Sequence, residues 1–250
     1  MHEERIFFTN ARGMVLHGVL HHPKGEKPRG AVILCHGMES NKDSPKLVLL
    51  GQSLAERGFL GLRFDFAAVG ATGNFEEITC SGEVADLQSA FTFVRSRYDG
   101  KIGLLGSSMG GTVTLLFTAQ QHDVAVIVTL AAPLHPQRFV DRLMTPGEVR
   151  RWRESGYTLY HGRRLNVSLL DDVQKINVPE AARRITCPVL ILHGDQDEVV
   201  PVEEARELHG CLAGPKKLSI LQNGNHRLSD AEIMKRALSE AIDWIYACVN

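Results

Sequence analysis

The sequence predicts an α/β fold, built on a mostly parallel sheet of about eight strands with helices on both faces and a small inserted cap. Short apolar runs of strand length alternate with longer stretches of helical pattern along most of the 250 residues. Most of these runs are apolar throughout, which is typical of parallel strands that are buried on both faces. One segment of about 50 residues interrupts the alternation and is too long for an ordinary connection.

The elements follow in order from this pattern. Residues 4–9 and 14–20 are expected to form an antiparallel hairpin around the turn-forming residues 10–13, at one edge of the sheet. Further strands are expected over residues 31–35, 59–64, 101–105, 124–130, 189–193 and 217–221. Helices are expected over residues 45–57, 82–97, 109–121, 202–212 and 229–247. Since a chain of this length can bury one large core, we expect a single domain over residues 1–250.

The interruption lies between the strands at 124–130 and 189–193 and is interpreted as a cap subdomain over residues 134–186. It contains aromatic residues, which argues against a disordered linker. Its many arginines are interleaved with acidic residues. This mixture favours a solvated, salt-bridged surface over an anion-binding pocket.

The composition favours a small, roughly neutral partner. The formal net charge is −1, from 28 basic and 29 acidic residues, so nothing points to nucleic acid or to an anionic membrane. The first residues are charged and no long apolar run occurs, so we expect no signal peptide, no stable membrane insertion and a cytoplasmic location. Phosphate-binding glycine loops and metal-ligand spacings are absent from the sequence, which predicts neither cofactor nor metal. The oligomeric state stays open.

The most informative motif is Gly106-Ser107-Ser108-Met109-Gly110, which follows an apolar run and precedes a helical stretch. This G-x-S-x-G pattern predicts a nucleophile elbow, in which a sharp strand-to-helix turn exposes the Ser108 hydroxyl. Small residues at Gly106 and Gly110 let the strand and the helix pass closely. The alternative is a glycine-rich turn in which Ser107 or Ser108 only caps the helix.

A serine hydroxyl needs a base to accept its proton and an acid to orient that base. In sheets of this topology the order along the chain is Ser, acid, His. His209 and His226 follow Ser108 with room for an acid between them. His209 lies in a helical stretch, whereas His226 lies in a loop between a strand and the last helix, so His226 is the expected base.

The acid is expected in the loop after the strand at 189–193, which carries Asp195, Asp197 and Glu198. Asp195 begins the turn, where backbone N–H groups can occupy its carboxylate. Asp197 lies further out and is freer to reach the imidazole. For a developing oxyanion, the N–H groups of Met109 and Met38 are the expected donors, from the elbow and from the loop after the strand at 31–35.

These features resemble the serine α/β-hydrolase superfamily and, within it, bacterial carboxylesterases of the cinnamoyl or feruloyl esterase type, with monoacylglycerol lipases as wider relatives. The resemblance covers nearly the whole chain. It includes His36-Gly37, Arg63-Phe-Asp65 followed by Gly70, the elbow, Tyr160-His-Gly-Arg-Arg-Leu-Asn166, His193-Gly-Asp-Gln-Asp-Glu-Val-Val-Pro201 and Asn225-His226. It implies that Ser108 is the nucleophile, Asp197 the acid, His226 the base, and Met38 and Met109 the oxyanion donors.

The sequence departs from these relatives at two places. They usually carry Gly-His-Gly where this chain has Ala68-Val69-Gly70, and commonly an aromatic residue in place of Met38. Both changes would reshape the substrate pocket and leave the three catalytic positions intact.

The expected function is a cofactor-independent carboxylesterase that forms an acyl-enzyme with a small-molecule ester, of short to medium acyl or hydroxycinnamate type. A thioesterase, an acyltransferase and a prolyl-type aminopeptidase would use the same triad. A peptidase would need a carboxylate for the substrate amine, for which Asp141, Glu148 and Glu154 of the cap are candidates. A non-catalytic ligand receptor on the same fold is favoured least, since all three catalytic positions are present.

Overall fold

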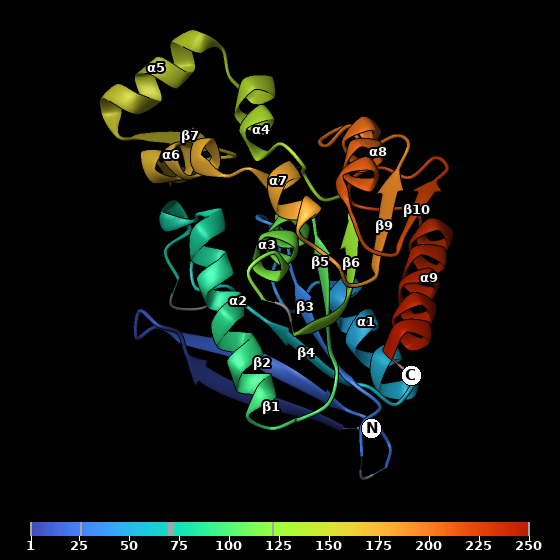
Figure 1. Cartoon of the computed structure of the whole chain (residues 1–250). Coiled ribbons are helices and arrows are strands. Elements are labelled where there is room, and N and C mark those ends of the chain that lie inside the picture. Colours follow the sequence, from blue (N-terminus) through green and yellow to red (C-terminus); the bar gives the residue numbers. More distant parts are fainter. Residues whose placement is uncertain (1, 26, 70–72, 122, 250) are drawn as a thin grey trace.

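A computed structural model describes residues 2–25, 27–69, 73–121 and 123–249. Its centre is an eight-stranded sheet in the order β1-β2-β4-β3-β5-β6-β9-β10 (Figure 1). The strands are β1 His2–Thr9, β2 Val15–His22, β3 Ala31–Cys35, β4 Leu60–Phe64, β5 Ile102–Ser107, β6 Val124–Leu130, β9 Val189–Gly194 and β10 Lys216–Leu221. β2 pairs antiparallel with β1 and β4, and the other neighbours pair in parallel. The predicted fold class is confirmed.

Helices cover both faces of this sheet. The helices outside the cap are α1 Pro45–Glu56, α2 Cys80–Arg95, α3 Met109–Thr118, α8 Val202–Cys211 and α9 Ala231–Val249, with a 3-10 turn, η1, at Phe75–Glu77. α1 and α9 pack on one face, with the side chains of Val32 and Leu34 from β3. α2, α3 and α8 pack on the other face, with Ile33 from the same strand. Alternate residues of one strand therefore contribute to two separate cores.

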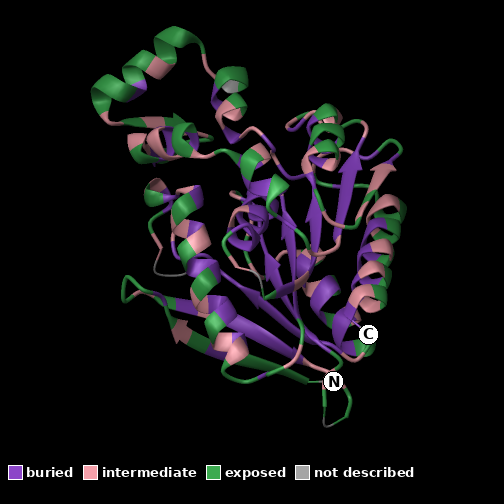
Figure 2. Cartoon of the chain, viewed as in Figure 1, coloured by how far each residue is buried: buried purple, intermediate pink, exposed green. Residues whose placement is uncertain are grey.

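Burial follows the apolar runs seen in the sequence. Every residue of β3, β4, β5 and β9 is buried, and the inner strands form the buried centre in Figure 2. The edge strands differ. β1 is mostly exposed and β10 is only half-buried, which agrees with their polar side chains. The core thus lies on both sides of the inner strands and fixes their carboxyl ends.

The segment between β6 and β9 forms its own group of elements beyond the carboxyl ends of the parallel strands (Figure 1). It contains α4 Pro136–Leu143, α5 Pro146–Ser155, the hairpin β7 Tyr157–Tyr160 and β8 Arg163–Asn166, α6 Val167–Lys175 and α7 Val178–Arg183. Trp152, Leu165 and Leu170 form a small core here, which also includes Met109 of α3. The segment is therefore packed onto the main body at the elbow.

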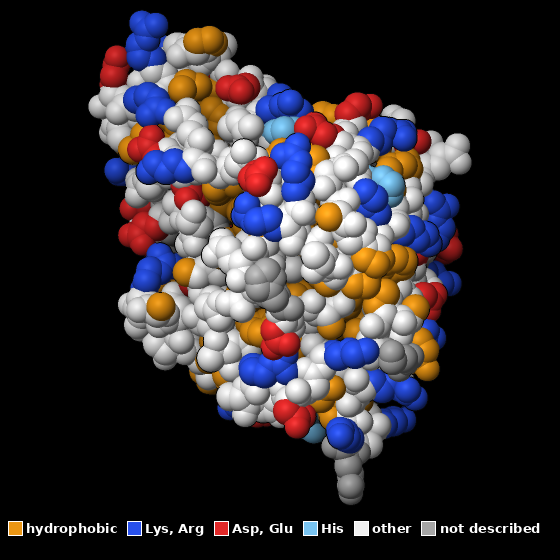
Figure 3. Space-filling model, viewed as in Figure 1, with side chains coloured by type: hydrophobic (Ala, Val, Ile, Leu, Met, Phe, Trp, Pro, Cys, Tyr) orange, Lys and Arg blue, Asp and Glu red, His pale blue; other side chains and the backbone are white. Residues whose placement is uncertain are grey.

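Charges of both signs are interspersed on the surface seen in Figure 3. In the cap segment, Arg153 pairs with Asp171 at 2.9 Å and Arg164 with Glu76 at 3.1 Å, as the mixed charge pattern predicts. Among the helices in the described ranges, none is both long and apolar enough to cross a membrane.

Candidate active site

Ser108 occupies a sharp turn between β5 and α3. Its φ of 52° and ψ of −126° put a non-glycine residue at positive φ, which costs energy and persists only where the surroundings hold it. A Cβ on Gly106 would collide with the Gly110 carbonyl, and one on Gly110 would collide with the carbonyls of Cys35 and His36. Ser108 makes no side-chain capping hydrogen bond, and its side chain faces a cavity.

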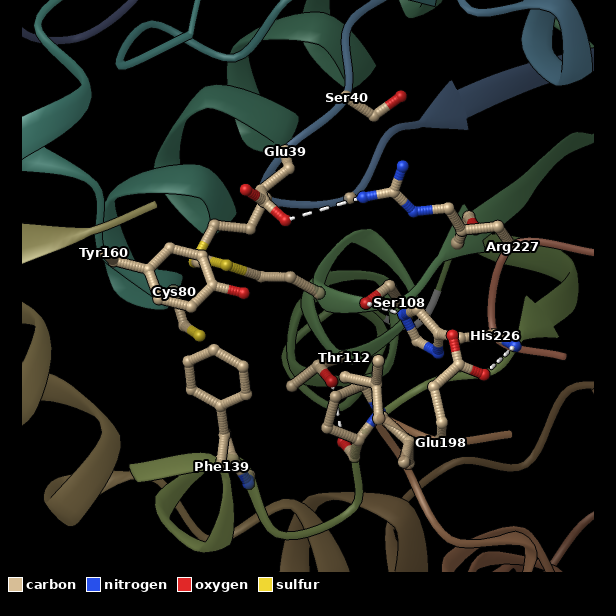
Figure 4. Close-up of a pocket in the computed structure, with 18 of the residues that line it drawn as sticks. Glu39, Ser40, Cys80, Ser108, Thr112, Phe139, Tyr160, Glu198, His226 and Arg227 are labelled. Atoms are coloured by element: carbon tan, nitrogen blue, oxygen red, sulfur yellow. Dashed lines mark hydrogen bonds and ion pairs between the residues drawn. The ribbon is translucent and has the colours of Figure 1, made fainter. Parts of the chain in front are cut away.

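Three residues predicted for the site come together at the carboxyl ends of the strands. The Nε2 atom of His226 lies 3.1 Å from Ser108 Oγ (Figure 4). The Nδ1 atom of the same ring lies 3.0 Å and 2.8 Å from the two carboxylate oxygens of Asp197. His226 follows β10 and Asp197 follows β9. His209 lies on α8 and is not one of the described residues that line the cavity.

The side chain of Asp197 is fully buried and receives several hydrogen bonds. Its Oδ1 accepts the backbone N–H groups of Val199 and Val200, at 2.9 Å and 2.7 Å. Burial raises the pKa of this carboxyl, but hydrogen bonds from His193 and His226, and the charge of His226, outweigh it. The pKa of Asp197 therefore lies well below its ordinary value, and the group is a carboxylate at neutral pH.

The sequence predicts Asp197 rather than Asp195 as the acid, but the reason behind that prediction is wrong. Asp195 was expected to bind the backbone of its own turn, yet its buried Oδ1 has no hydrogen-bond partner among the described residues. β9 continues to Gly194, one residue beyond its expected end, so the turn begins later. Asp197 is the residue whose carboxylate accepts the N–H groups of the turn, and it also faces His226.

The loops that carry Asp197 and His226 are joined through their backbones. The N–H of Gln196 donates to the Gly224 carbonyl at 3.0 Å, and that of Asp195 donates to the Leu221 carbonyl at 3.1 Å. A Cβ on Gly194 would collide with the carbonyl of Gly224. The close approach therefore requires glycine and fixes the two loops relative to each other.

Met38 and Met109 both line the cavity beside Ser108. Gly37 brings the Met38 loop against the serine, since a Cβ on Gly37 would lie 3.1 Å from Ser108 Cβ. Within the described part of the chain, the N–H groups of Met38 and Met109 donate to no backbone or side-chain acceptor. Two free donors beside a serine hydroxyl are the arrangement that oxyanion stabilisation needs.

The His36 ring holds the loop after β3 through two hydrogen bonds. Its Nε2 accepts the Phe66 N–H at 3.2 Å, and its Nδ1 donates to the Gly37 carbonyl at 2.9 Å. Burial lowers the pKa of His36, which keeps the ring neutral. Further along, Asp65 accepts the Lys42 N–H at 2.7 Å. The polar residues of the Arg63-Phe-Asp65 motif therefore support this loop.

The cavity has a volume of about 690 Å³ and an apolar wall supplied partly by the cap segment. Cap residues that line it are His135, Pro136, Phe139, Val140, Arg142, Tyr160, His161, Leu169 and Val173. Figure 4 shows Phe139 and Tyr160 across the pocket from His226 and Glu198. The rings of Phe139 and Tyr160 meet edge to face, with centroids 5.6 Å apart. Ala68 and Val69 pack beside this apolar group, whereas Gly70 lies outside the described residues.

Two functional-site residues escaped the sequence analysis. Lys46, the second residue of α1, reaches the cavity and donates to Ser107 Oγ at 3.3 Å. His193, fully buried at the end of β9, lies 3.2 Å from Asp197 Oδ2. His193 is the first residue of the motif at 193–201, and its place in that motif is a sequence signal for a role beside Asp197. Lys46 carries no such signal, because a lysine in the first turn of a helix is usually solvated.

Comparison with known proteins agrees with this geometry. The family model described as serine aminopeptidase, S33, matches residues 26–155, slightly more than half of the chain. The chain belongs to this family. The S33 match confirms the predicted membership of the α/β-hydrolase superfamily, and the chain is a serine hydrolase.

Individual relatives agree with this assignment. The chain is 25% identical over 238 residues to the mouse mitochondrial palmitoyl-protein thioesterase ABHD10, covering 88% of this chain and 77% of that protein. It is 27% identical over 232 residues to 2,6-dihydropseudooxynicotine hydrolase of Paenarthrobacter nicotinovorans, covering 90% and 59%. Among solved structures, the ferulic acid complex of Est1E from Butyrivibrio proteoclasticus has a TM-score of 0.84 at 22% identity, covering 96% and 99%. Mouse ABHD10 has a TM-score of 0.82 at 22% identity, covering 97% and 98%.

Proposed function

We propose that this S33-family chain hydrolyses carboxylic esters through an acyl-enzyme, with Ser108 as nucleophile, His226 as base and Asp197 as acid. The observation that carries the proposal is the placement of the His226 ring, whose nitrogens face Ser108 Oγ at 3.1 Å and the Asp197 carboxylate at 2.8 Å. Because Asp197 is anionic and accepts from Nδ1, it leaves the lone pair of Nε2 directed at the serine hydroxyl.

The reaction then follows in two halves. Ser108 Oγ attacks the carbonyl carbon while its proton passes to His226 Nε2, and the carbonyl oxygen becomes an anion that the Met38 and Met109 amides stabilise. The C–O bond to the alcohol breaks, and the alcohol leaves with the proton from Nε2. Water attacks the acyl-enzyme and gives its proton to the same nitrogen. The bond between the acyl carbon and Ser108 Oγ then breaks, Oγ takes the proton back from Nε2, and the acid is released.

We infer that residues 134–186 act as the cap of this site and select the substrate. A volume of about 690 Å³ suits a small molecule, and the apolar wall with the Phe139 and Tyr160 rings suits a short to medium acyl or hydroxycinnamate group. Ferulic acid is the ligand in the Est1E complex, which supports the hydroxycinnamate half.

Thioester hydrolysis is the second candidate, since the mouse, bovine and rat relatives are palmitoyl-protein thioesterases. The same three residues would cleave a thioester by the same steps. The cap carboxylates expected to bind the amine of a peptidase substrate do not line the cavity. Asp141, Glu148 and Glu154 are absent from the cavity lining among the described residues, and Glu148 is engaged in the capping box of α5.

The test is covalent labelling. A fluorophosphonate should modify one residue of the native enzyme, Ser108, and peptide mapping should locate the adduct there. Ser108→Ala should abolish labelling and lower kcat for 4-nitrophenyl butyrate by about 10⁴ to 10⁶. Labelling at another residue, or full turnover by Ser108→Ala, contradicts the proposal. Comparing 4-nitrophenyl butyrate with butyrylthiocholine as substrates then ranks ester hydrolysis against thioester hydrolysis.

A further inference from the structure

Lys46 is a cationic residue in the cavity wall for which the proposed reaction has no use. It lies in the first turn of α1 and lines the cavity together with Ser108 and His226. Its Nζ donates to the hydroxyl of Ser107, at 3.3 Å. Ser107 is the residue directly before the proposed nucleophile, so the ammonium group lies beside the reacting centre rather than on an outer surface.

The charge of Lys46 is unbalanced, unlike that of the other cations lining the cavity. Arg142 pairs with Glu204 at 2.9 Å, and Arg227 lies 3.8 Å from Glu39. Lys46 has no carboxylate within 4.0 Å among the described residues. An ammonium group has three N–H donors, and Ser107 accepts only one of them. Two donors and a full charge therefore remain for a ligand.

Burial makes this arrangement costly for the free enzyme. It lowers the pKa of Lys46 to about 8, while the negative charge of Asp197 acts in the opposite direction. At neutral pH the group is still mainly protonated, so a half-buried cation with no salt-bridge partner among the described residues faces the cavity. Buried charges in proteins are normally paired. A ligand that brought its own anion would supply the missing partner.

We propose that Lys46 binds a carboxylate of the substrate, so that the natural ester or thioester carries an anionic group close to the bond that is cleaved. This inference rests on the proposed function and narrows its substrate class. The nearby acidic groups do not compete for Lys46. Asp197 is held by the His226 ring and by backbone N–H groups, and Glu198 accepts the backbone N–H of His226 at 3.1 Å.

The test uses two pairs of substrates that differ only in charge. In 3-butyryloxybenzoate and 3-butyryloxybenzamide the carboxylate or carboxamide is on the leaving alcohol. In monoethyl adipate and its monoamide it is on the acyl group. At pH 7 the native enzyme should prefer the carboxylate of at least one pair by about 10-fold or more in kcat/KM, as expected for a charged hydrogen bond. The pair that shows the preference identifies the side that carries the anion.

Variants assign the preference to Lys46. In Lys46→Met the ratio of acid to amide should fall to near one, and Lys46→Arg should retain most of it. Lys235→Met is the control, because Lys235 is an exposed lysine of α9 that does not line the cavity. Its ratio should match the native ratio. Because each ratio is measured within one variant, the fraction of folded enzyme cancels.

A pH profile gives an independent readout. The native ratio should decline as pH rises through about 8, where free Lys46 loses its proton, and the Lys46→Met ratio should be flat. The other ionisable groups are present in both proteins and cancel in the comparison. They are the neighbouring Asp197 and, in the cavity wall, Glu39, Cys80, His135, Arg142, Tyr160, His161, Glu198, Glu204, His226 and Arg227. Native ratios near one in both pairs, an unchanged ratio in Lys46→Met, or an equal loss in Lys235→Met would each overturn the proposal.

Failure of the proposed function is distinguishable from failure of this inference. If none of the four esters and no 4-nitrophenyl butyrate is hydrolysed, the esterase proposal fails, and binding still decides the role of Lys46. In the Ser108→Ala background, calorimetry should show 3-butyryloxybenzoate binding about 10-fold more tightly than its amide. Lys46→Met should remove the difference. Equal affinities in the parent rule out anion recognition by Lys46.

Discussion

The Nε2 atom of His193 lies 3.2 Å from Oδ2 of Asp197, so the carboxylate that faces His226 also faces a second, fully buried imidazole. The same Nε2 lies 2.8 Å from the Val200 carbonyl. Both neighbours are acceptors, which assigns the hydrogen to Nε2. His193 therefore shares its one Nε2–H between the Val200 carbonyl and the Asp197 carboxylate, and holds the carboxylate from within the core.

Removing that donor should weaken catalysis without removing the substrate site. We expect His193→Leu to lower kcat by about 10-fold with little change in KM, since one hydrogen bond to a charged group is lost. The freed Asp197 becomes more basic and stabilises the His226 imidazolium more strongly. The acid limb of the pH–rate profile should therefore move to higher pH. His193→Gln, which keeps an N–H donor, should recover part of kcat; equal defects in both variants without a shifted limb contradict this role.

The two aspartates of the loop after β9 should separate cleanly in kinetics. Asp197→Asn should reduce kcat by about 10⁴, because an amide does not favour the required imidazole tautomer or stabilise the imidazolium. Asp195→Asn should stay within about 10-fold of the native kcat. Its melting temperature should also stay near the native value, since Oδ1 of Asp195 has no partner to lose. An inactive Asp195→Asn beside an active Asp197→Asn would reverse the assignment.

Stability should depend on pH through Asp197. Its pKa is lower in the folded protein than in the unfolded chain, where it is about 3.9. The stabilisation is therefore complete above about pH 4 to 5 and is lost as pH falls toward the folded pKa. Urea unfolding at pH 7 should show Asp197→Asn less stable than the native protein, and the gap should narrow between about pH 4 and pH 3. A constant gap would mean that this carboxylate is not the titrating group.

The contact between Gly194 and Gly224 should be intolerant of a methyl group. Gly194→Ala places a Cβ against the Gly224 carbonyl of the neighbouring loop and should cost about 2 to 4 kcal/mol of unfolding free energy. Gly224→Ala, whose Cβ only crowds Leu221 and Gly194, should cost less. Each should also lower kcat by separating Asp197 from His226. Gly210→Ala on α8 is the control, since a Cβ there meets no atom within 4 Å and alanine favours a helix. Equal stabilities for Gly210→Ala and Gly194→Ala would refute the backbone constraint.

Much of the fold could be predicted because its signals are local. The inner strands read as uninterrupted apolar runs, and the elbow is recorded in the spacing of Gly106, Ser108 and Gly110. Which aspartate faces His226 was expected for the wrong reason, because the turn depends on where β9 ends. That end is set by pairing with β10, a contact distant in sequence.

Lys46 could not be predicted at all. Whether a side chain in the first turn of α1 points to solvent or to the cavity depends on how the preceding loop is tied down. That loop is anchored by Asp65, from another strand, through the Lys42 N–H at 2.7 Å. The direction of Lys46 is thus a property of the assembled fold.

The small core of the cap segment is open to the cavity on one side, because some of its apolar side chains also form the cavity wall. They are Cys80, Met109, Val140, Leu169 and Val173. A ligand that fills the cavity covers these side chains as a neighbouring residue would, so occupancy and the folding of the cap are thermodynamically linked. A bound substrate thus acts as a temporary part of the hydrophobic core. Molecules that fit should reveal themselves by a higher melting temperature, before any turnover is measured.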